Sequence, residues 1–515
     1  MTTPSEFSAG RDATTHPSLA KNTAFNIASS LVRLLIGLVV SPILFWKLGA
    51  ETYGLWSVIW AFTGFLALAD FRLGYATTPL IAAAQESGDS KQVKDLANTG
   101  LFVYVILGAS AVVIAFALMQ FEVTTAWLPD YIEQDIVFIV PAAVTVFACT
   151  TIITLLSGIL YGLQRYDITS KIAILVDIVR AFLLVGIALA GGGLRDLVLA
   201  EAGIALLKCL LLAVATRRSI PGFGPTLSPK LAVFRELFSF GLKLEVAHIT
   251  HLLSLHLDKL LLTAFLGLEA VAFYDLGAKV VGVARTMPLL LVSATLPVVS
   301  TLETAGERKR LREFFEKGTS ILSWCGLPIF VWAVVCAGPL LFAWAGITEL
   351  EARVTVWILS FGFFLSVYSG MANSVIIGIG KPELEMKRSI LAGFLNIVLS
   401  STLIQIIGFP GAPMGTSLAV ASGSVYLTAS VYKYFDRPLY QLIKPLLPAL
   451  LPILPSATGA YLILWIAGVS RGGAIIGVAG AALFVGFIYL LAGMRYGIIS
   501  RAFYESVRYT TKPKV

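Results

Sequence analysis

Ionisable side chains gather in an otherwise apolar stretch near the middle of the chain, residues 237–265. If the stretch is drawn as a helix, six ionisable side chains lie on an arc of about 160°. They are Glu245, His248, His251, His256, Asp258 and Lys259. Histidine titrates near neutral pH, so the histidines and the two carboxylates are candidates to carry a proton or hold a small coupling ion. A network that neutralises itself internally explains the same pattern equally well, and the two interpretations are compatible.

The first apolar stretch carries a polar stripe that contains an arginine. On a helix the stripe covers an arc of about 120° and comprises Asn22, Asn26, Ser29, Ser30, Arg33, Gly37 and Ser41. Arg33 lies about ten residues, or roughly 15 Å, into this helix. A charge at that depth of a bilayer costs at least about 2.5–3.5 kcal/mol. We expect Arg33 to line a hydrated cavity and contact an anionic ligand; burial against a carboxylate of another helix is the alternative.

Residues 269–299 add further charges on one helical face. Asp275 and Lys279 have the i, i+4 spacing of an ion pair, which leaves Arg285 as the freer cation and the better candidate for ligand contact. Arg72 ends the second apolar stretch, where a topology anchor is the preferred interpretation and ligand contact the alternative.

Residues 170–216 carry Asp177, Arg180, Glu201 and Lys208, of which Asp177 and Arg180 are spaced i, i+3 as in a structural pair. The anion-binding candidates are Arg33, Arg285, Lys279, Arg180 and Arg72. The cavity-lining polar candidates are Asn22, Asn26, Ser29, Ser30 and His251. The proton- or ion-coupling candidates are His248, His251, His256, Glu245, Asp258 and Asp275.

The elements that must position these side chains are membrane-spanning helices. The chain has 515 residues, of which 57% are hydrophobic and 13% charged, whereas soluble proteins carry about 25% charged residues. Its mean hydropathy is +0.86. A surface this apolar fits lipid, where helices satisfy their own backbone hydrogen bonds. The expected fold is therefore an all-α polytopic membrane protein.

The apolar runs predict about fourteen spans of roughly 20 residues or more. They cover residues 23–46, 52–72, 97–119, 134–160, 170–190, 196–216, 237–265, 269–299, 316–343, 352–378, 386–408, 413–433, 443–469 and 472–494. Basic residues concentrate in alternate loops: residues 308–317 hold five, and residues 120–135 hold none. The positive-inside rule then places both termini in the cytoplasm, and it explains the net charge of +8 without nucleic acid.

An internal repeat divides the helices into two lobes. At an offset of 218 residues, Leu48-Gly49 matches Leu266-Gly267, and Arg33 corresponds to His251. Six helices per copy give two lobes in the same orientation, as in secondary transporters with a substrate path between repeats. The expected parts are a cytoplasmic N-terminal tail 1–22, an N-lobe 23–216, a linker 217–236, a C-lobe 237–433, an extra helix pair 443–494 and a cytoplasmic tail 495–515.

Residues 24–84 carry a recognisable pattern, AFNIASSLVRLLIGLVVSPILFWKLGAETYGLWSVIWAFTGFLALADFRLGYATTPLIAAA. Its parts are a polar-striped first helix, Pro42, then LGAETYGLWS, then a helix ending in ADFRLGYATTPL. This pattern resembles the polysaccharide transporters and O-antigen flippases of the multidrug/oligosaccharidyl-lipid/polysaccharide (MOP) exporter superfamily. The resemblance implies transfer of an undecaprenyl-pyrophosphate-linked oligosaccharide across the bacterial plasma membrane. Arg33, Arg72 and Arg285 would be the matching cavity cations, although Arg72 lies far toward its helix end.

The implied partners are the lipid-linked oligosaccharide, membrane lipid, H⁺ or Na⁺ as coupling ion, and polysaccharide polymerase or export machinery. A multidrug or small-solute antiporter on the same scaffold and a lipid II flippase are the alternatives. An enzyme such as a membrane glycosyltransferase is disfavoured, since the sequence has no Gly-rich phosphate loop, no H-E-x-x-H motif and no nucleophile elbow. We expect no cofactor and no metal site.

Overall fold

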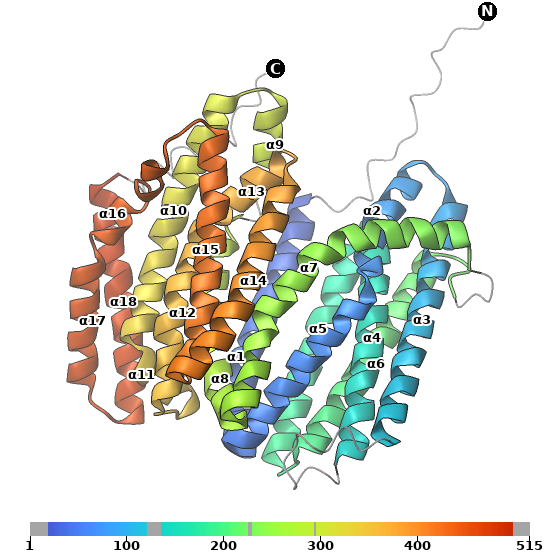
Figure 1. Cartoon of the computed structure of the whole chain (residues 1–515), viewed down its shortest axis with the longest axis horizontal. Helices are drawn as coiled ribbons and strands as arrows, with labels where there is room; N and C mark the ends of the chain where they lie inside the picture. The colour runs from blue at the N-terminus through green and yellow to red at the C-terminus, as the bar shows by residue number, and fades with distance from the viewer. Residues whose placement is uncertain (1–18, 121–134, 225–228, 293–294, 498–515) are drawn as a thin grey trace, which may run out of the picture. The chain divides into compact units, whose positions relative to one another are not determined.

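The computed structural model describes residues 19–120, 135–224, 229–292 and 295–497 (Figure 1). Within these ranges, the side chains of 19–28, 69, 118, 120, 243–244, 246–255 and 297 are left undescribed. All regular secondary structure in the described ranges is helical, which confirms the predicted class. Among the described residues, ten helices are long and apolar enough to cross a membrane.

The helices of the N-terminal half begin and end close to the predicted spans. They are α1 Leu19–Leu66, η1 Ala67–Asp70, α2 Leu73–Glu86, α3 Ser90–Gln120, α4 Ile136–Gly162, α5 Tyr166–Leu189, α6 Leu194–Ser219 and α7 Leu231–Leu266. Gly49 interrupts α1 with a φ of +78°, so α1 is two helices joined at a kink, in the gap predicted between the first two spans. The second predicted span continues beyond residue 72: after positive φ angles at Phe71 and Arg72 the chain forms α2.

The C-terminal half divides more finely than predicted. It comprises α8 Leu268–Leu289, α9 Leu296–Thr304, α10 Arg308–Val335, α11 Ala337–Ala345, α12 Leu350–Tyr368, α13 Gly370–Gly378, α14 Pro382–Ile407, α15 Gly411–Tyr434, η4 Leu439–Ile443, α16 Leu447–Leu450, α17 Ile453–Ala467 and α18 Arg471–Arg495. Three predicted single spans are thus each two helices, and the predicted span 443–469 is divided among η4, α16 and α17. Pro288 at the end of α8 and Pro339 in the first turn of α11 account for two of the breaks, because proline removes a helical hydrogen bond.

The chain packs as two compact units. The first contains the residues up to Gly37 and Ala69–Glu245, and the second contains Leu38–Leu68 and the residues from Val246 onward. Helices α1 and α7 therefore contribute to both units. The lobe boundaries expected from the repeat stay a prediction, since a repeat unit and a packing unit need not coincide.

The internal repeat is visible in the packing inside each unit. In the first unit, a Cβ on Gly162 of α4 would lie 2.8 Å from the Ile81 side chain of α2. In the second unit, a Cβ on Gly378 of α13 would lie 2.4 Å from the Val299 side chain of α9. Ile81 and Val299 correspond at the offset of 218 residues, and the two glycines correspond at an offset of 216. Both halves therefore use the same close helix approach.

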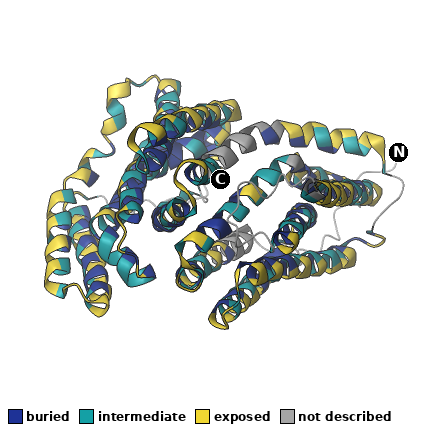
Figure 2. Ribbon diagram, turned by 60° about the horizontal axis from the view of Figure 1, so that its bottom comes forward, coloured by how far each residue is buried: buried dark blue, intermediate teal, exposed yellow. Residues whose placement is uncertain are grey.

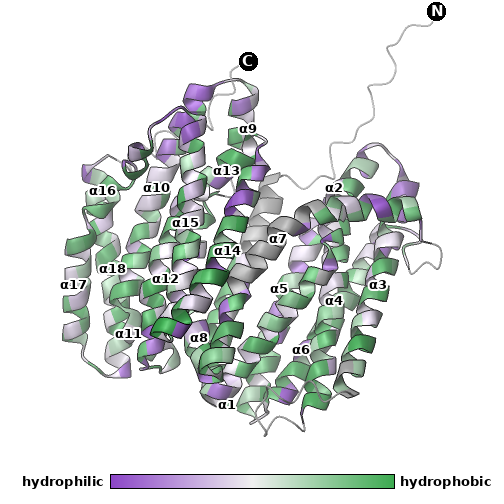
Figure 3. Cartoon of the chain, in the orientation of Figure 1, coloured by the Kyte–Doolittle hydropathy of each residue, from purple (hydrophilic) through white to green (hydrophobic). Residues whose placement is uncertain are grey.

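The outer faces of the helices are apolar (Figures 2 and 3). Large side chains such as Phe182 and Leu483 are 78% and 77% exposed. Exposed apolar area on this scale is unfavourable in water and favourable against lipid tails. The chain is accordingly a multi-pass membrane protein, and a polar side chain inside a span requires a specific reason.

Candidate functional sites

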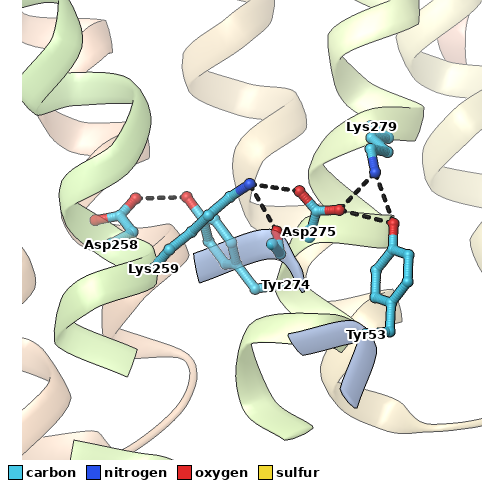
Figure 4. Close-up of polar contacts among 7 residues, drawn as sticks. Tyr53, Asp258, Lys259, Tyr274, Asp275 and Lys279 are labelled. Carbon is cyan, nitrogen blue, oxygen red and sulfur yellow. Dashed lines mark hydrogen bonds and ion pairs between the residues drawn. The ribbon is translucent and has the colours of Figure 1, made fainter. Parts of the chain in front are cut away.

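The second unit contains an ionic network centred on Asp275 of α8 (Figure 4). The carboxylate, 6% exposed, accepts hydrogen bonds from the Nζ atoms of Lys259 and Lys279 at 2.6 Å each and from the Tyr53 hydroxyl at 2.9 Å. Lys259 also donates to the Ser57 hydroxyl at 2.9 Å, and Lys279 donates to the Tyr53 hydroxyl at 2.6 Å. Two ammonium groups share one carboxylate, so this network, the Asp275 cluster, has an excess of one positive charge.

Three helical segments bring the Asp275 cluster together. Tyr53 and Ser57 lie on the segment of α1 after its kink, Lys259 on α7, and Asp275 with Lys279 on α8. The i, i+4 pair expected between Asp275 and Lys279 is present. Lys279 keeps 35% of its side chain exposed, whereas Lys259 keeps 15%. Lys279 is thus the member of the cluster that an outside ligand can reach most readily.

Asp258 of α7 forms a second polar centre in the same unit. It is 1% exposed and accepts hydrogen bonds from the hydroxyls of Tyr274, Thr416 and Ser400 and, at 3.4 Å, from the Asn396 amide. None of these described partners is a cation. An isolated buried carboxylate is costly, and neutral donors offset only part of that cost. The Asp258 site is therefore chemically suited to take up a proton or a small cation.

Helices α14 and α15 supply most of the Asp258 site. The Asn396 amide also donates to Ser400 at 3.2 Å and to Thr416 at 2.8 Å, which orients the amide toward the carboxylate. Asn396 and Ser400 are one helical turn apart on α14, a spacing that the sequence contains. Thr416 and Tyr274 were not predicted, because a single hydroxyl in a helix gives no signal of its partner.

The first unit contains a different ionic cluster, built from α1, α5 and α6. Arg33 Nε lies 3.4 Å from an Asp177 carboxylate oxygen, and Arg33 keeps 63% of its side chain exposed. Arg180 Nε lies 2.8 and 2.9 Å from the two carboxylate oxygens of Glu201, and its Nη2 lies 2.5 Å from one of them. Lys208 interacts electrostatically with Asp177, Arg33 and Arg180. With three cations and two carboxylates, this Arg33 cluster is net positive.

The Arg33 cluster corrects one expected pairing. Asp177 and Arg180 share α5, but each pairs with a residue of another helix instead of with the other. Arg33 does have a carboxylate partner, as the alternative interpretation supposed, yet it is exposed and not buried. A charge this exposed within a membrane-spanning helix must face water or a polar ligand, because lipid contact would be too costly.

The other predicted cations lie outside both clusters. Arg72 stacks over the Tyr75 ring at 4.1 Å, at the break between η1 and α2. Arg285 Nε donates to the Ser366 hydroxyl at 3.1 Å, and its guanidinium lies 5.4 Å from the centre of the Phe363 ring. Neither contact brings these arginines to Arg33 or Lys279, so their predicted role in binding a ligand stays a prediction.

The remaining predicted residues are dispersed. Glu245 is 3% exposed and belongs to the first unit, and His256 packs its ring 6.1 Å from the ring of Phe65 in the second. Ser29 is buried and Ser30 exposed. Four predicted side chains lie outside the described residues: Asn22, Asn26, His248 and His251.

Comparisons with known proteins agree with this architecture. Residues 19–303 match the family model described as "Polysaccharide biosynthesis protein", and residues 246–402 match the MatE family model. The chain is 19% identical over 417 residues to the "Probable flippase AglR" of Haloferax volcanii, covering 81% of this chain and 84% of that one. It is 21% identical over 420 residues to the "Putative O-antigen transporter" of Shigella flexneri, covering 80% and 97%.

Solved structures share the fold at low sequence identity. One titled "Lipid II flippase MurJ, inward closed conformation" superposes with a TM-score of 0.73 at 14% identity, covering 92% of this chain and 98% of that one. An inward-facing multidrug resistance MATE family transporter of the MOP superfamily superposes with a TM-score of 0.65 at 15% identity, covering 82% and 99%. At these identities the likeness establishes the fold alone.

Proposed function

Because the chain belongs to the polysaccharide biosynthesis protein family, whose model matches more than half of it, we propose that it is a flippase for an undecaprenyl-pyrophosphate-linked oligosaccharide. It acts in the bacterial plasma membrane with both termini in the cytoplasm. The observation that carries the proposal is Arg33, a cation 63% exposed within a membrane-spanning helix. The assigned activity is transport, without a chemical reaction.

The physical problem of such a substrate matches the Arg33 cluster. A pyrophosphate with attached sugars is anionic and polar, so its passage through hydrocarbon is opposed by desolvation. Guanidinium and ammonium groups offset that cost by binding phosphate oxygens directly. The polyprenyl tail needs no such help, since it stays in lipid. Alternating access of the two repeats completes the proposed cycle.

Coupling to an ion gradient is assigned to the Asp258 site. Its carboxylate and three hydroxyl groups are oxygen ligands, the kind that a small hard cation prefers. A bound H⁺ or Na⁺ would neutralise the buried charge that no described cation partner now neutralises. The cation is expected to enter and leave this site during each cycle.

The test is transport in vesicles with purified protein, using a fluorescent undecaprenyl-pyrophosphate-linked oligosaccharide whose exposed fraction is read by a membrane-impermeant quencher. Arg33→Ala should lower the initial rate at least tenfold, because it removes the exposed cation. Arg310→Ala is the matched control: the Arg310 side chain is 64% exposed and pairs with Glu307, three residues earlier in the chain. Equal amounts of inserted protein must be verified for each variant.

Two outcomes would overturn the assignment. One is an unchanged rate when Arg33→Ala and Arg285→Ala are combined. The other is preferential transport of a cationic dye or of lipid II over the oligosaccharide, which would favour the antiporter or the peptidoglycan flippase. In cells, loss of the protein should cause a lipid-linked oligosaccharide to accumulate on the cytoplasmic side.

A further inference from the structure

Helix α5 carries two ion pairs less than one turn apart that differ in character. Arg180 and Glu201 make three contacts of 2.5–2.9 Å, and the Glu201 side chain is 8% exposed. Arg33 and Asp177 make a single contact of 3.4 Å, with Arg33 63% exposed. The first pair has the geometry of a permanent structural link, and the second has the geometry of a weak pair that solvent can separate.

Besides Arg33, two cations lie within the electrostatic reach of Asp177: Arg180, which pairs with Glu201, and Lys208. Lys208 of α6 is half-buried and interacts with Asp177 through space, yet it makes no ion pair within 4 Å among the described residues. Asp177 itself is 14% exposed and therefore stays inside the cluster, whichever cation it contacts. The carboxylate thus contacts an exposed arginine and interacts through space with a half-buried lysine, which has no contact of that kind among the described residues.

We propose that Asp177 is an exchangeable counter-ion, which occupies the place of the substrate's phosphate on Arg33 in the empty protein and transfers to Lys208 when that phosphate binds. This inference rests on the proposed function. A carboxylate and a phosphate present similar oxygens to a guanidinium, so one can replace the other at Arg33. The exchange keeps Asp177 beside a cation before and after substrate binding, and it gives Lys208 an anionic partner once the phosphate occupies Arg33.

The exchange has a purpose in a transport cycle. If Arg33 lacked a counter-ion, it would hold the phosphate more tightly than a transporter can tolerate, and release would become slow. If Asp177 held Arg33 as firmly as Glu201 holds Arg180, the substrate could not compete. The single long contact at 3.4 Å is suited to a competitor that must yield. Asp177 is therefore a positioning residue, which acts on the substrate through Arg33.

The test measures the initial flipping rate in vesicles at increasing densities of the fluorescent lipid-linked oligosaccharide. Asp177→Asn should lower the half-saturating density and also lower the maximal rate, each about fivefold, the effect of losing one exposed ion pair. Asp177→Glu, which keeps the charge, should restore both parameters toward wild type. Asp95→Asn is the matched control, since Asp95 forms an exposed ion pair with Lys230 in the same unit, and neither parameter should change.

Lys208→Met gives a second variant with an effect of opposite sign. Without the lysine, Asp177 loses the cation to which it is proposed to transfer, because Glu201 already holds Arg180, and it stays on Arg33 more persistently. The half-saturating density should then rise about fivefold. This variant keeps the inference testable if Asp177→Asn fails to insert.

The outcomes separate this inference from the proposed function. If Arg33→Ala and Arg285→Ala combined leave flipping unchanged, the proposed function is wrong. If Arg33→Ala abolishes flipping while Asp177→Asn and Lys208→Met leave the half-saturating density unchanged, only the counter-ion role is wrong. A lower maximal rate in Asp177→Asn at constant half-saturating density, without rescue by Asp177→Glu, would indicate a merely structural residue and would also refute it.

Discussion

Replacing Asp275 by asparagine should destabilise the second unit more than any single change at an exposed ion pair. The carboxylate is 6% exposed and accepts hydrogen bonds from Lys259, Lys279 and Tyr53. Asparagine has nearly the same shape but no charge, so the cavity is unchanged. What changes is the electrostatic balance: two ammonium groups stay in place without the anion that they share.

The size of the effect follows from burial. Breaking a buried ion pair by removing one partner costs about 3–5 kcal/mol, because the other charge is left uncompensated. Lys259 is 15% exposed, so most of that free-energy cost comes from its uncompensated charge. Lys279 is 35% exposed, so water screens much of its share. We therefore expect about 3 kcal/mol, which for a unit of about 300 residues lowers the midpoint of thermal unfolding by roughly 5 °C.

The assay is thermal unfolding of the purified protein in detergent, followed by tryptophan fluorescence. Asp436→Asn is the control, since Asp436 is 81% exposed and pairs with Arg308 at 3.1 Å. That change should cost less than about 1 kcal/mol. Adding Lys259→Met to Asp275→Asn should recover part of the loss, because the double variant removes the uncompensated charge together with its partner.

Two results would refute this reasoning. Equal midpoints for Asp275→Asn and Asp436→Asn would show that the buried carboxylate does not hold the lysines. A double variant less stable than Asp275→Asn alone would show that the cost comes from lost packing and not from charge.

Two further predictions concern other contacts. Asp258→Asn should make flipping insensitive to a change in the H⁺ or Na⁺ gradient while leaving insertion intact, measured in vesicles with imposed gradients; gradient sensitivity equal to wild type would contradict the coupling role. Gly162→Ala should lower the unfolding midpoint by several degrees, because the new Cβ would meet Ile81 at 2.8 Å. Gly186→Ala, which has open space within 4 Å, should be neutral or stabilising by up to about 1 kcal/mol.

Short-range spacing predicted the local parts of the sites. The i, i+4 relation of Asp275 and Lys279 gives a real ion pair, because both residues lie on one face of α8 and nothing intervenes. The i, i+3 relation of Asp177 and Arg180 does not, since each side chain has a better partner on another helix. The spacing of two residues along one helix shows which ion pairs are possible. Which of them form depends on the charged side chains of the neighbouring helices.

Contacts between residues far apart in the chain could not be predicted from the sequence. The Tyr53 hydroxyl donates to Asp275 across 222 residues, and Thr416 donates to Asp258 across 158 residues. A tyrosine or threonine in an apolar helix is common, and nothing in its local pattern names a distant carboxylate. The all-helical class, in contrast, follows from composition alone, because lipid leaves the backbone few alternatives.

Corresponding helices of the two repeats carry different polar groups at equivalent positions. At the offset of 216 residues, Arg180 of α5 corresponds to Asn396 of α14, and helices α5 and α6 correspond to α14 and α15. In the first unit, an ion pair between Arg180 and Glu201 links the two helices, and each charge neutralises the other. In the second unit, a hydrogen bond from the Asn396 amide to the Thr416 hydroxyl links the two helices, and the remaining N–H and O–H donors of this pair require an acceptor.

That acceptor is Asp258 of α7, which places a carboxylate among neutral donors in a buried site. The exchange of an ion pair for an amide and a hydroxyl thus removes a permanent cation from the site. It leaves a negative charge that a mobile cation can neutralise. In the first unit the permanent link at Arg180 leaves Arg33 as the exposed cation. One helix pair, duplicated and then altered at its polar positions, can in this way provide an anion-facing surface in one repeat and a cation-binding site in the other.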